Sequence, residues 1–276
     1  YPWLDSGARD SYNQVLRHLD RALLDASKAT LEKKGKRKGF PKLKRKRYGF
    51  GSISGTNASG VKLHHIDYDN NTIKLPKIGV VKTKWSKKLP SEFKSWTIKQ
   101  KAGKWYIAFK VEVPKQPKVK QINSTVGVDL NSKDIAVTSD AAIIPNPKFY
   151  AKTKRELRKA QRSQSRKQKG SNNRRKQTRR VQKLHDRVRN QRRDFLDKLT
   201  TDLIMQYDVI CLEDLNIRAM QRWNGRMIQD AGFGEIRRMM NYKADLYGKH
   251  VIFIDRYAPS TQMCSNCGHV KTDDEK

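Results

Sequence analysis

The sequence contains few cysteines, few acidic residues and no long apolar run. Three cysteines in 276 residues are too few for a disulfide framework of the kind that holds small secreted domains together. No apolar run approaches the roughly 18 residues of a membrane-spanning helix, and no signal-peptide pattern opens the chain. The sequence therefore predicts a soluble intracellular protein without a membrane partner.

The scarcity of acidic side chains gives the chain a large positive charge. It has 27 Asp and Glu against 61 Lys and Arg, a formal net charge of +34 at pH 7. Residues 28–47 carry 11 basic and 1 acidic side chain, and residues 152–193 carry 19 and 2. Such dense runs favour binding along a phosphate backbone. A disordered basic arm is the alternative, but helical apolar spacing continues through residues 152–193.

We expect basic side chains in these two segments to contact nucleic acid. In the first segment the candidates are Lys36, Arg37, Lys42, Lys44, Arg45, Lys46 and Arg47. In the second they are Arg155, Arg158, Arg162, Arg166, Lys167, Lys169, Arg174, Arg175, Lys176, Arg179 and Arg180.

The first 121 residues predict a helix followed by a small β domain. Apolar residues recur at helical spacing over residues 5–31, at Tyr12, Val15, Leu16, Leu19, Leu23 and Ala26. Residues 49–121 instead alternate apolar and polar side chains between Gly, Asn and Pro, which is typical of strands. The clearest hairpin joins residues 95–100 to 105–113 through a turn at 101–104. We expect a small barrel or curled sheet.

From residue 125 onward the pattern predicts an α/β unit. Strands are expected at 125–130, 134–139, 209–212 and 251–254, with helices at 152–168, 174–207 and 232–248. In the helix at 174–207, apolar residues keep a nearly heptad spacing, so one face packs and the other is basic.

Two carboxylates interrupt apolar strands of this unit. Asp129 lies within Val126–Leu130, and Glu213 ends the strand at 209–212. A carboxylate in a buried strand needs a cation, and two such strands in one sheet would bring their oxygens together on Mg²⁺ for two-metal phosphodiester hydrolysis. A strand-end cap or an ion pair is the alternative for any single Asp, and we favour it for Asp140, Asp208, Asp214 and Asp255.

An ordered series of motifs resembles the transposon-encoded TnpB nucleases, RNA-guided relatives of type V CRISPR effectors. The motifs run through most of the chain: 39–42, 75–79, 127–130, 133–138, 165–171, 190–195, 211–216, 230–235 and 264–268. The resemblance implies an α+β multidomain fold. Its expected parts are a helical recognition segment at 1–38, a β-barrel wedge domain at 39–120, an RNase H-like (RuvC-type) nuclease domain at 121–260 including basic helices at 152–207, and half of a zinc ribbon at 261–276.

The resemblance also implies an activity. By motif position, Asp129 matches the first catalytic carboxylate of the family and Glu213 the second. Members bind a guide RNA and cut target DNA with Mg²⁺, while base pairing reads most of the sequence. The resemblance places the protein in the prokaryotic cytoplasm, with the nucleoid, in the context of transposition and DNA recombination. Nothing in the sequence indicates its oligomeric state.

Two departures from the family pattern leave alternatives open. Asn131 stands where the family usually has Gly, and we expect a left-handed residue there to preserve the turn. The family's second C-x-x-C and its Arg-Asp motif, with the third catalytic carboxylate, do not follow Cys267, and position 1 is Tyr rather than Met, so we expect a fragment lacking both ends. A binding module that does not cut is therefore the alternative. Asp255 is only a weak candidate to replace the missing third carboxylate. A strand-transferring transposase and a basic ribosomal protein explain the residues less well.

We expect the pair Cys264 and Cys267 to be half of a structural zinc site. Such a site takes four ligands, so Zn²⁺ is expected only in the complete protein. His269 lies too near the pair to replace the missing ligands, and Cys211 fits a core residue. A redox C-x-x-C and an unrelated pair are the alternatives.

Overall fold

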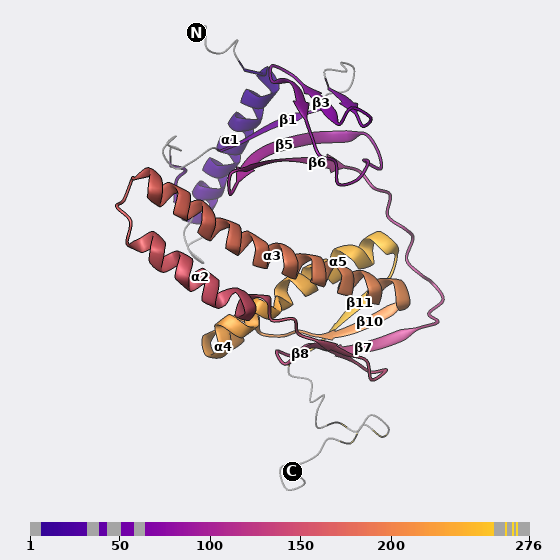
Figure 1. Cartoon of the computed structure of the whole chain (residues 1–276). Coiled ribbons are helices and arrows are strands. Elements are labelled where there is room, and N and C mark those ends of the chain that lie inside the picture. The colour runs from indigo at the N-terminus through magenta and orange to yellow at the C-terminus, as the bar shows by residue number, and fades with distance from the viewer. Residues whose placement is uncertain are drawn as a thin grey trace. The chain divides into compact units, whose positions relative to one another are not determined.

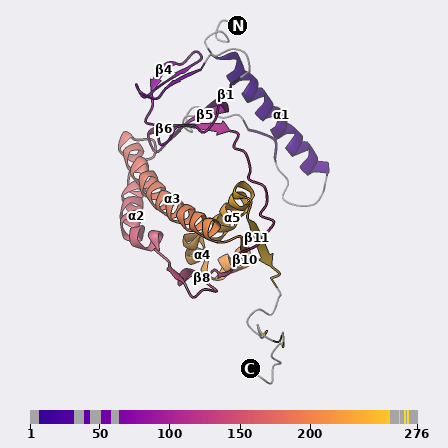
Figure 2. The ribbon, with the colours of Figure 1, turned by 90° about the vertical axis from the view of Figure 1, so that its right-hand side faces the viewer.

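A computed structural model describes residues 7–31, 39–42, 51–57, 64–256, 263, 267 and 269. The chain divides into two compact units, residues 1–113 and 114–276 (Figures 1 and 2). No helix within the described ranges is long and apolar enough to cross a membrane.

The first unit consists of one helix and two small antiparallel sheets. Its elements are α1 (Arg9–Leu31), β1 (Ser52–Thr56), β2 (His65–Asp67), β3 (Thr72–Leu75), β4 (Gly79–Lys82), β5 (Phe93–Lys101) and β6 (Lys104–Val111). One sheet has the order β1-β5-β6 and the other β2-β3-β4. Ile73, Leu75, Phe93 and Trp96 form its buried core. The expected closed barrel is therefore wrong for the described part of this unit, because its strands form two separate sheets.

The predicted hairpin at 95–113 is confirmed as β5 and β6. Lys101 pairs with Lys104, which leaves Ala102 and Gly103 as a two-residue turn with φ of 49° and 82°. Positive φ at both positions matches the right-handed twist of the paired strands. This tight turn fixes the register that places Ile107 and Phe109 against the core.

The predicted N-terminal helix forms, but most of its apolar stripe is exposed. Val15 and Leu16 are each 62% exposed, and only Ala26 of the stripe is fully buried. Contact with β1 depends on Asp10, whose carboxylate accepts hydrogen bonds from the backbone N–H and the hydroxyl of Thr56.

The second unit is built on a five-stranded mixed sheet. Its strands are β7 (Thr125–Asp129), β8 (Asp134–Thr138), β9 (Ile143–Pro145), β10 (Val209–Glu213) and β11 (His250–Ile254), in the order β11-β10-β7-β8-β9. β10 runs parallel to both β7 and β11, whereas β7, β8 and β9 pair antiparallel. The predicted strands at 125–130, 134–139, 209–212 and 251–254 are thereby confirmed within one or two residues.

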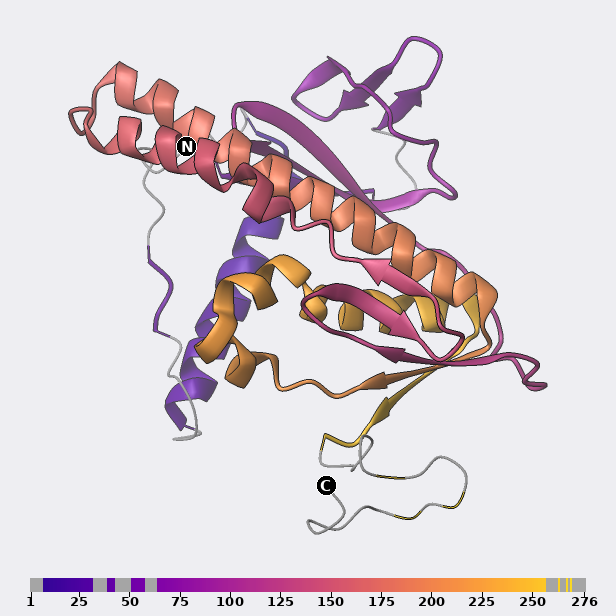
Figure 3. The ribbon, with the colours of Figure 1, turned by 60° about the horizontal axis from the view of Figure 1, so that its bottom comes forward.

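Helices cover one face of this sheet (Figure 3). The helices described in this unit are α2 (Phe149–Ser165), α3 (Asn172–Gln206), α4 (Ile217–Ala231) and α5 (Phe233–Tyr247). The C-terminal half of α3, together with α4 and α5, packs on Val126, Val128, Ile210 and Leu212 of the central strands. Because side chains alternate along a strand, Gly127, Asp129, Cys211 and Glu213 are left on the opposite, open face.

The N-terminal half of α3 forms a helical hairpin with α2. Leu157 and Ala160 of α2 pack on Val181 and Leu184 of α3 in a separate small core. The Ser171 hydroxyl caps α3 by accepting a hydrogen bond from the Arg174 backbone N–H at 3.2 Å. At 35 residues, α3 is about 50 Å long, and it therefore serves both the sheet and the hairpin.

Two glycines allow close approaches in this unit. Gly232 has φ 74° and is the residue at which α4 ends and α5 begins. Gly248 has φ 67°, and a Cβ there would lie 2.1 Å from the carbonyl oxygen of Pro117. Only glycine meets both requirements at position 248 without displacing the segment before β7.

Candidate functional site

Asp129 and Glu213 lie at the same edge of the sheet. Asp129 is the last residue of β7 and Glu213 the last of β10. These strands are parallel neighbours, and their register pairs Val128 with Leu212, one residue before each carboxylate. The sheet therefore brings together the two carboxylates that the sequence singled out, at the carboxyl ends of adjacent strands.

The expectation that these carboxylates are buried is wrong. Asp129 is exposed and Glu213 is partly exposed, whereas Val128 and Leu212 before them are buried. The apolar run around Asp129 suggested burial on both faces, but helices cover only one face of the sheet among the described residues. The carboxylates therefore lie outside the apolar core, and their oxygens are accessible to ligands.

A pocket on the open face includes both carboxylates. It has a volume of 310 Å³, and its walls come from β7, β8, β10 and β11: Gly127, Val128, Asp129, Val137, Thr138, Ser139, Cys211, Glu213 and Ile254. The space in front of Gly127 is open, since a Cβ there would meet only the Ser139 side chain, at 3.8 Å. A second cavity of 230 Å³ adjoins the other side of Glu213 and includes Asp214 and Arg256.

Two arginines hold Asp214, the residue after Glu213. Arg256 donates from Nη2 to Asp214 Oδ2 at 2.8 Å and from Nε to the Asp214 carbonyl oxygen at 2.9 Å. Arg237 of α5 pairs with Oδ1 and lies over the Phe253 ring, 4.5 Å from its centroid. Asp214 is therefore a structural ion-pair partner, as favoured from the sequence, and its two arginines link α5 and the end of β11 to the end of β10.

The turn after Asp129 forms by a different means from the expected one. Asn131 is not in the left-handed region. Instead, its side-chain oxygen accepts hydrogen bonds from the backbone N–H groups of Lys133 and Asp134, at 3.0 and 2.8 Å. Its side-chain nitrogen lies 3.5 Å from Asp129 Oδ2. An Asx-type turn thus replaces the conformational freedom that glycine would provide.

The oxygen ligands of this pocket suit a hard divalent cation. Mg²⁺ prefers carboxylate oxygens and retains several water ligands, which an open pocket allows. Asp129 and Glu213 supply two carboxylates, and within the described ranges no group of three or more His, Cys, Asp or Glu side chains is arranged as a metal site. The residues present fit the protein-side ligands of a largely hydrated magnesium site.

The described residues do not form a zinc site. Cys264 lies outside them, and Cys267 is exposed. Cys211 lies on the open face of the sheet, partly exposed, rather than in the core position expected for it. The predicted pairing of Cys264 and Cys267 on zinc stays a prediction.

The predicted phosphate-binding residues fall into two groups. Of the first segment only Lys42, which is exposed, is described; Lys36, Arg37, Lys44, Arg45, Lys46 and Arg47 lie outside the described residues. The second group lies on α2, on α3 and in the turn between them, and all of its members except Lys167 and Arg174 are exposed. Arg174 donates to the carbonyl oxygens of Gln164 and Lys167, at 3.1 and 2.8 Å, and so closes the end of α2.

Family comparisons match most of the chain. The family described as "Probable transposase" matches residues 108–224, and "Cas12f1-like, TNB domain" matches residues 233–276. A Streptomyces pristinaespiralis protein named "Putative RNA-guided DNA endonuclease" is 32% identical over 265 residues, covering 94% of this chain and 62% of that protein. The Escherichia coli protein "Putative RNA-guided DNA endonuclease InsQ" is 32% identical over 290 residues, covering 97% and 67%.

More distant relatives and a solved structure are also similar. "TnpB-like protein L79" of Acanthamoeba polyphaga mimivirus is 25% identical over 182 residues, covering 60% of this chain and 35% of that protein. A Cas12f1 chain in a complex with guide RNA and target DNA aligns over 80% of this chain and 53% of that chain, with a TM-score of 0.47 and 14% identity. The chain thus spans about two thirds of the length of its more similar curated relatives.

Proposed function

The chain belongs to the TnpB-like family, and from this premise we propose that it acts in an RNA-guided DNA endonuclease that hydrolyses phosphodiester bonds with a divalent metal. The observation that carries the proposal is the side-by-side placement of Asp129 and Glu213 in an open pocket. Guide RNA and target DNA are the proposed partners. The proposed place of action is the DNA of a prokaryotic cell, in the context of transposition.

The two carboxylates have a defined task in this proposal. Asp129 and Glu213 hold Mg²⁺, which when bound supplies charge to activate a water and to stabilise the leaving oxygen. Asn131 keeps the Asp129 turn in place, and the Asp214 ion pairs keep the end of β10 in place. The open face around Gly127 leaves room for a nucleic-acid strand to approach the carboxylates.

The domain assignment follows from the same premise. We assign residues 121–260 to an RNase H-like (RuvC-type) nuclease domain, residues 1–38 to a recognition segment, residues 39–120 to a wedge domain of two open sheets, and residues 261–276 to a zinc ribbon that uses Cys264 and Cys267. The mixed sheet supports the nuclease assignment, because its order sets β7 beside β10. The exposed basic side chains of α2 and α3 would follow the phosphates of the guide RNA or its heteroduplex.

Substitution of the carboxylates in the full-length protein tests the proposal. In Asp129→Asn or Glu213→Gln, we expect guided DNA cleavage in Mg²⁺ to fall more than about a hundredfold, since even residues that only support metal ligands cost 10- to 100-fold. Guide-RNA affinity should not change, because both side chains lie away from the basic hairpin. Cleavage rates of a matched target and filter-binding of the RNA give the two readings.

Asp140→Asn is the matched control. Asp140 is an exposed carboxylate just after β8 that accepts hydrogen bonds from the Tyr207 hydroxyl, at 2.6 Å, and from the Ser139 hydroxyl, at 3.4 Å, and it does not itself line the pocket. This variant should cut at the rate of the unsubstituted protein. Cleavage that survives Asp129→Asn would contradict the metal assignment, and RNA-dependent binding without any cutting by the unsubstituted protein would support the non-cleaving alternative.

A further inference from the structure

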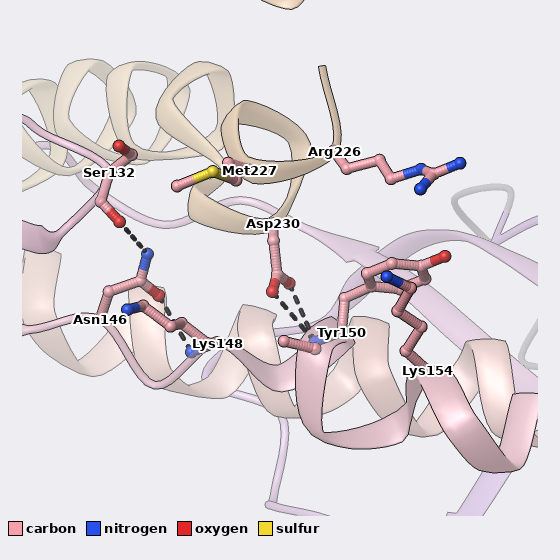
Figure 4. Close-up of a pocket in the computed structure, with 9 residues that line it drawn as sticks. Ser132, Asn146, Lys148, Tyr150, Lys154, Arg226, Met227 and Asp230 are labelled. Carbon is pink, nitrogen blue, oxygen red and sulfur yellow. Dashed lines mark hydrogen bonds between the residues drawn. The ribbon is translucent and has the colours of Figure 1, made fainter. Parts of the chain in front are cut away.

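A third cavity of the unit formed by residues 114–276 lies apart from the carboxylate pocket and shares no residue with it. Its volume is 240 Å³, and it lies between the start of α2 and the end of α4 (Figure 4). The residues that line it are Ser132, Asn146, Lys148, Tyr150, Ala151, Lys154, Arg226, Met227 and Asp230. Of the lining residues only Asp230 belongs to a motif noted in the sequence, the one at 230–235, and the proposed nuclease chemistry does not use this cavity.

The wall of the cavity is suited to a flat apolar group. Its apolar surface includes Tyr150, Ala151 and Met227. Tyr150 also packs against the small core of the helical hairpin, so its ring is already held in place before a ligand binds. The volume is below the roughly 300–1,000 Å³ of pockets for drug-sized molecules, and it suits a single ring system.

The rim of the cavity is cationic. Lys148, Lys154 and Arg226 form no ion pair among the described residues. The one carboxylate in the lining, Asp230, is buried and already paired: it accepts from Arg192 Nη2 at 2.6 Å and from the Tyr150 backbone N–H at 3.1 Å. Three unpaired cations around an apolar cavity favour a ligand that carries both a flat ring and a negative charge.

We propose that this cavity binds one unpaired nucleotide of a single nucleic-acid strand. The base lies in the cavity against Tyr150 and Met227, and the adjoining phosphates lie at Lys148, Lys154 and Arg226. Every base has a π face, so stacking of this kind tolerates any sequence, as a guided nuclease requires. The inference rests on the proposed function for the presence of a strand, and the same chemistry applies to RNA and DNA.

Filling the cavity tests the base contact. Met227 is 49% exposed at the rim, so Met227→Trp should fold and occupy the space of the base. We expect its affinity for oligouridine to fall about tenfold, from the 1–3 kcal/mol that base–aromatic stacking contributes. Affinity for an abasic strand of equal length, and for duplex RNA, should stay the same. Met205→Trp is the matched control, since Met205 is 56% exposed on α3 and does not line the cavity.

Removing a rim charge tests the phosphate contact. Arg226→Gln should weaken binding of oligouridine and of the abasic strand alike and reduce the salt slope by about 0.7, the value for one single-strand phosphate. Arg222→Gln, on the same helix but outside the cavity, should leave the Arg226-dependent part of binding intact. Repeating the measurements with oligothymidine shows which nucleic acid supplies the nucleotide. If the variants lose affinity for oligouridine alone, the cavity binds RNA; if they lose affinity for both strands, it binds either.

The outcomes separate this inference from the proposed function. If Met227→Trp binds base-bearing and abasic strands as the unsubstituted protein does, the cavity holds no base, and the inference is overturned even where guided cleavage is normal. If Met205→Trp lowers affinity equally, the effect is not specific to the cavity and the inference is again overturned. The inference is supported if Met227→Trp, but not Met205→Trp, loses the preference for base-bearing over abasic strands. This outcome does not depend on whether the full-length protein cuts.

Discussion

Asp214 shows how a single residue can support the site without touching a ligand. Asp214 directly follows Glu213 in the chain. Its two carboxylate oxygens form ion pairs with Arg237 and Arg256. We therefore assign it as a positioning residue for Glu213. In the full-length protein, Asp214→Asn should raise the Mg²⁺ concentration for half-maximal cleavage by about 10- to 100-fold, the range for residues that orient metal ligands. A Mg²⁺ titration of the cleavage rate measures this shift.

The control for this prediction is another ion pair on α5. Glu235→Gln removes the contact of Glu235 with Arg238, in which both side chains are 55% exposed, and exposed pairs of this kind contribute little. The Mg²⁺ midpoint should not move in Glu235→Gln. An unchanged midpoint in Asp214→Asn, with a lower rate at every Mg²⁺ concentration, would show that Asp214 acts on stability and not on metal binding.

Asp208, immediately before β10, makes stability depend on pH. A hydrogen bond from Lys249 at 2.7 Å, supported by the backbone N–H of Asn123 at 2.9 Å, lowers the pKa of Asp208 to about 2. Because the folded-state pKa lies below the ordinary value near 3.9, the ionised form stabilises the fold above about pH 4. That contribution decreases as pH falls through about 2.

Asp208→Asn isolates this contribution. We expect the variant to unfold at lower urea concentration than the unsubstituted protein at pH 7, because Lys249 loses its charged partner. The difference in unfolding free energy should be constant above about pH 5 and shrink toward pH 2. Urea unfolding across this pH range provides the measurement, and a difference that persists unchanged at pH 2 would show that the carboxylate's charge is not the cause.

Sequence reasoning found the candidate carboxylates but not their supporting arginines. Asp129 and Glu213 stood out as acidic residues in apolar strands, a signal that is local in the chain. Arg237 and Arg256 are 23 and 42 residues away from Asp214. Their role depends on how α5 and β11 pack beside β10, which no local pattern specifies. The same limit explains the wrong expectation of burial, since the sequence did not show that one face of the sheet is open.

At the scale of elements, those with strong turn or capping residues were predicted best. The hairpin of β5 and β6 and the two helices α2 and α3 were found because their breaks, at 101–104 and 170–173, are clear in sequence. The strands β1, β2, β4 and β9 were missed. They are three to five residues long and depend on pairing with a neighbour for their structure, so local periodicity carries little information about them.

The helix α4 was missed for a different reason. Gly225 lies in its middle and lowers the helix propensity, so the sequence did not predict a helix between 217 and 231. Its ends are nevertheless marked: the Asn216 side chain caps its first turn, accepting from the Ala219 N–H at 3.2 Å, and Gly232 ends it in the left-handed conformation. Ile228 and Ala231 then hold it against the core of the sheet. Asn216 and Gly232, sixteen residues apart, were therefore the sequence signal that could have predicted this helix.

At the scale of the whole molecule, the positive charge is divided evenly but arranged differently in the two units. Residues 1–113 carry 26 basic and 9 acidic side chains, and residues 114–276 carry 35 and 18, so each has a net charge of +17. In the second unit, residues 152–193 account for all of that excess, and the remaining residues are balanced at 16 and 16. The hairpin of α2 and α3 is therefore a concentrated basic element beside a sheet that carries acidic residues.

This arrangement predicts that position, and not net charge alone, sets the strength of nucleic-acid binding. Two variants remove four positive charges each by substitution with Gln. One changes the exposed hairpin residues Arg175, Lys176, Arg179 and Arg180, and the other the exposed residues Lys82, Lys84, Lys87 and Lys110. The hairpin variant should lower the log–log salt slope for duplex binding by up to about 3.6, at about 0.9 for each phosphate that the protein no longer neutralises, and the other variant by less than about 1. Affinity titrations over a range of salt concentrations measure both slopes. If phosphates lie along the hairpin, the hairpin variant must show the larger decrease in salt slope. Equal decreases in the two variants would mean that only the overall electrostatic field of the protein attracts nucleic acid.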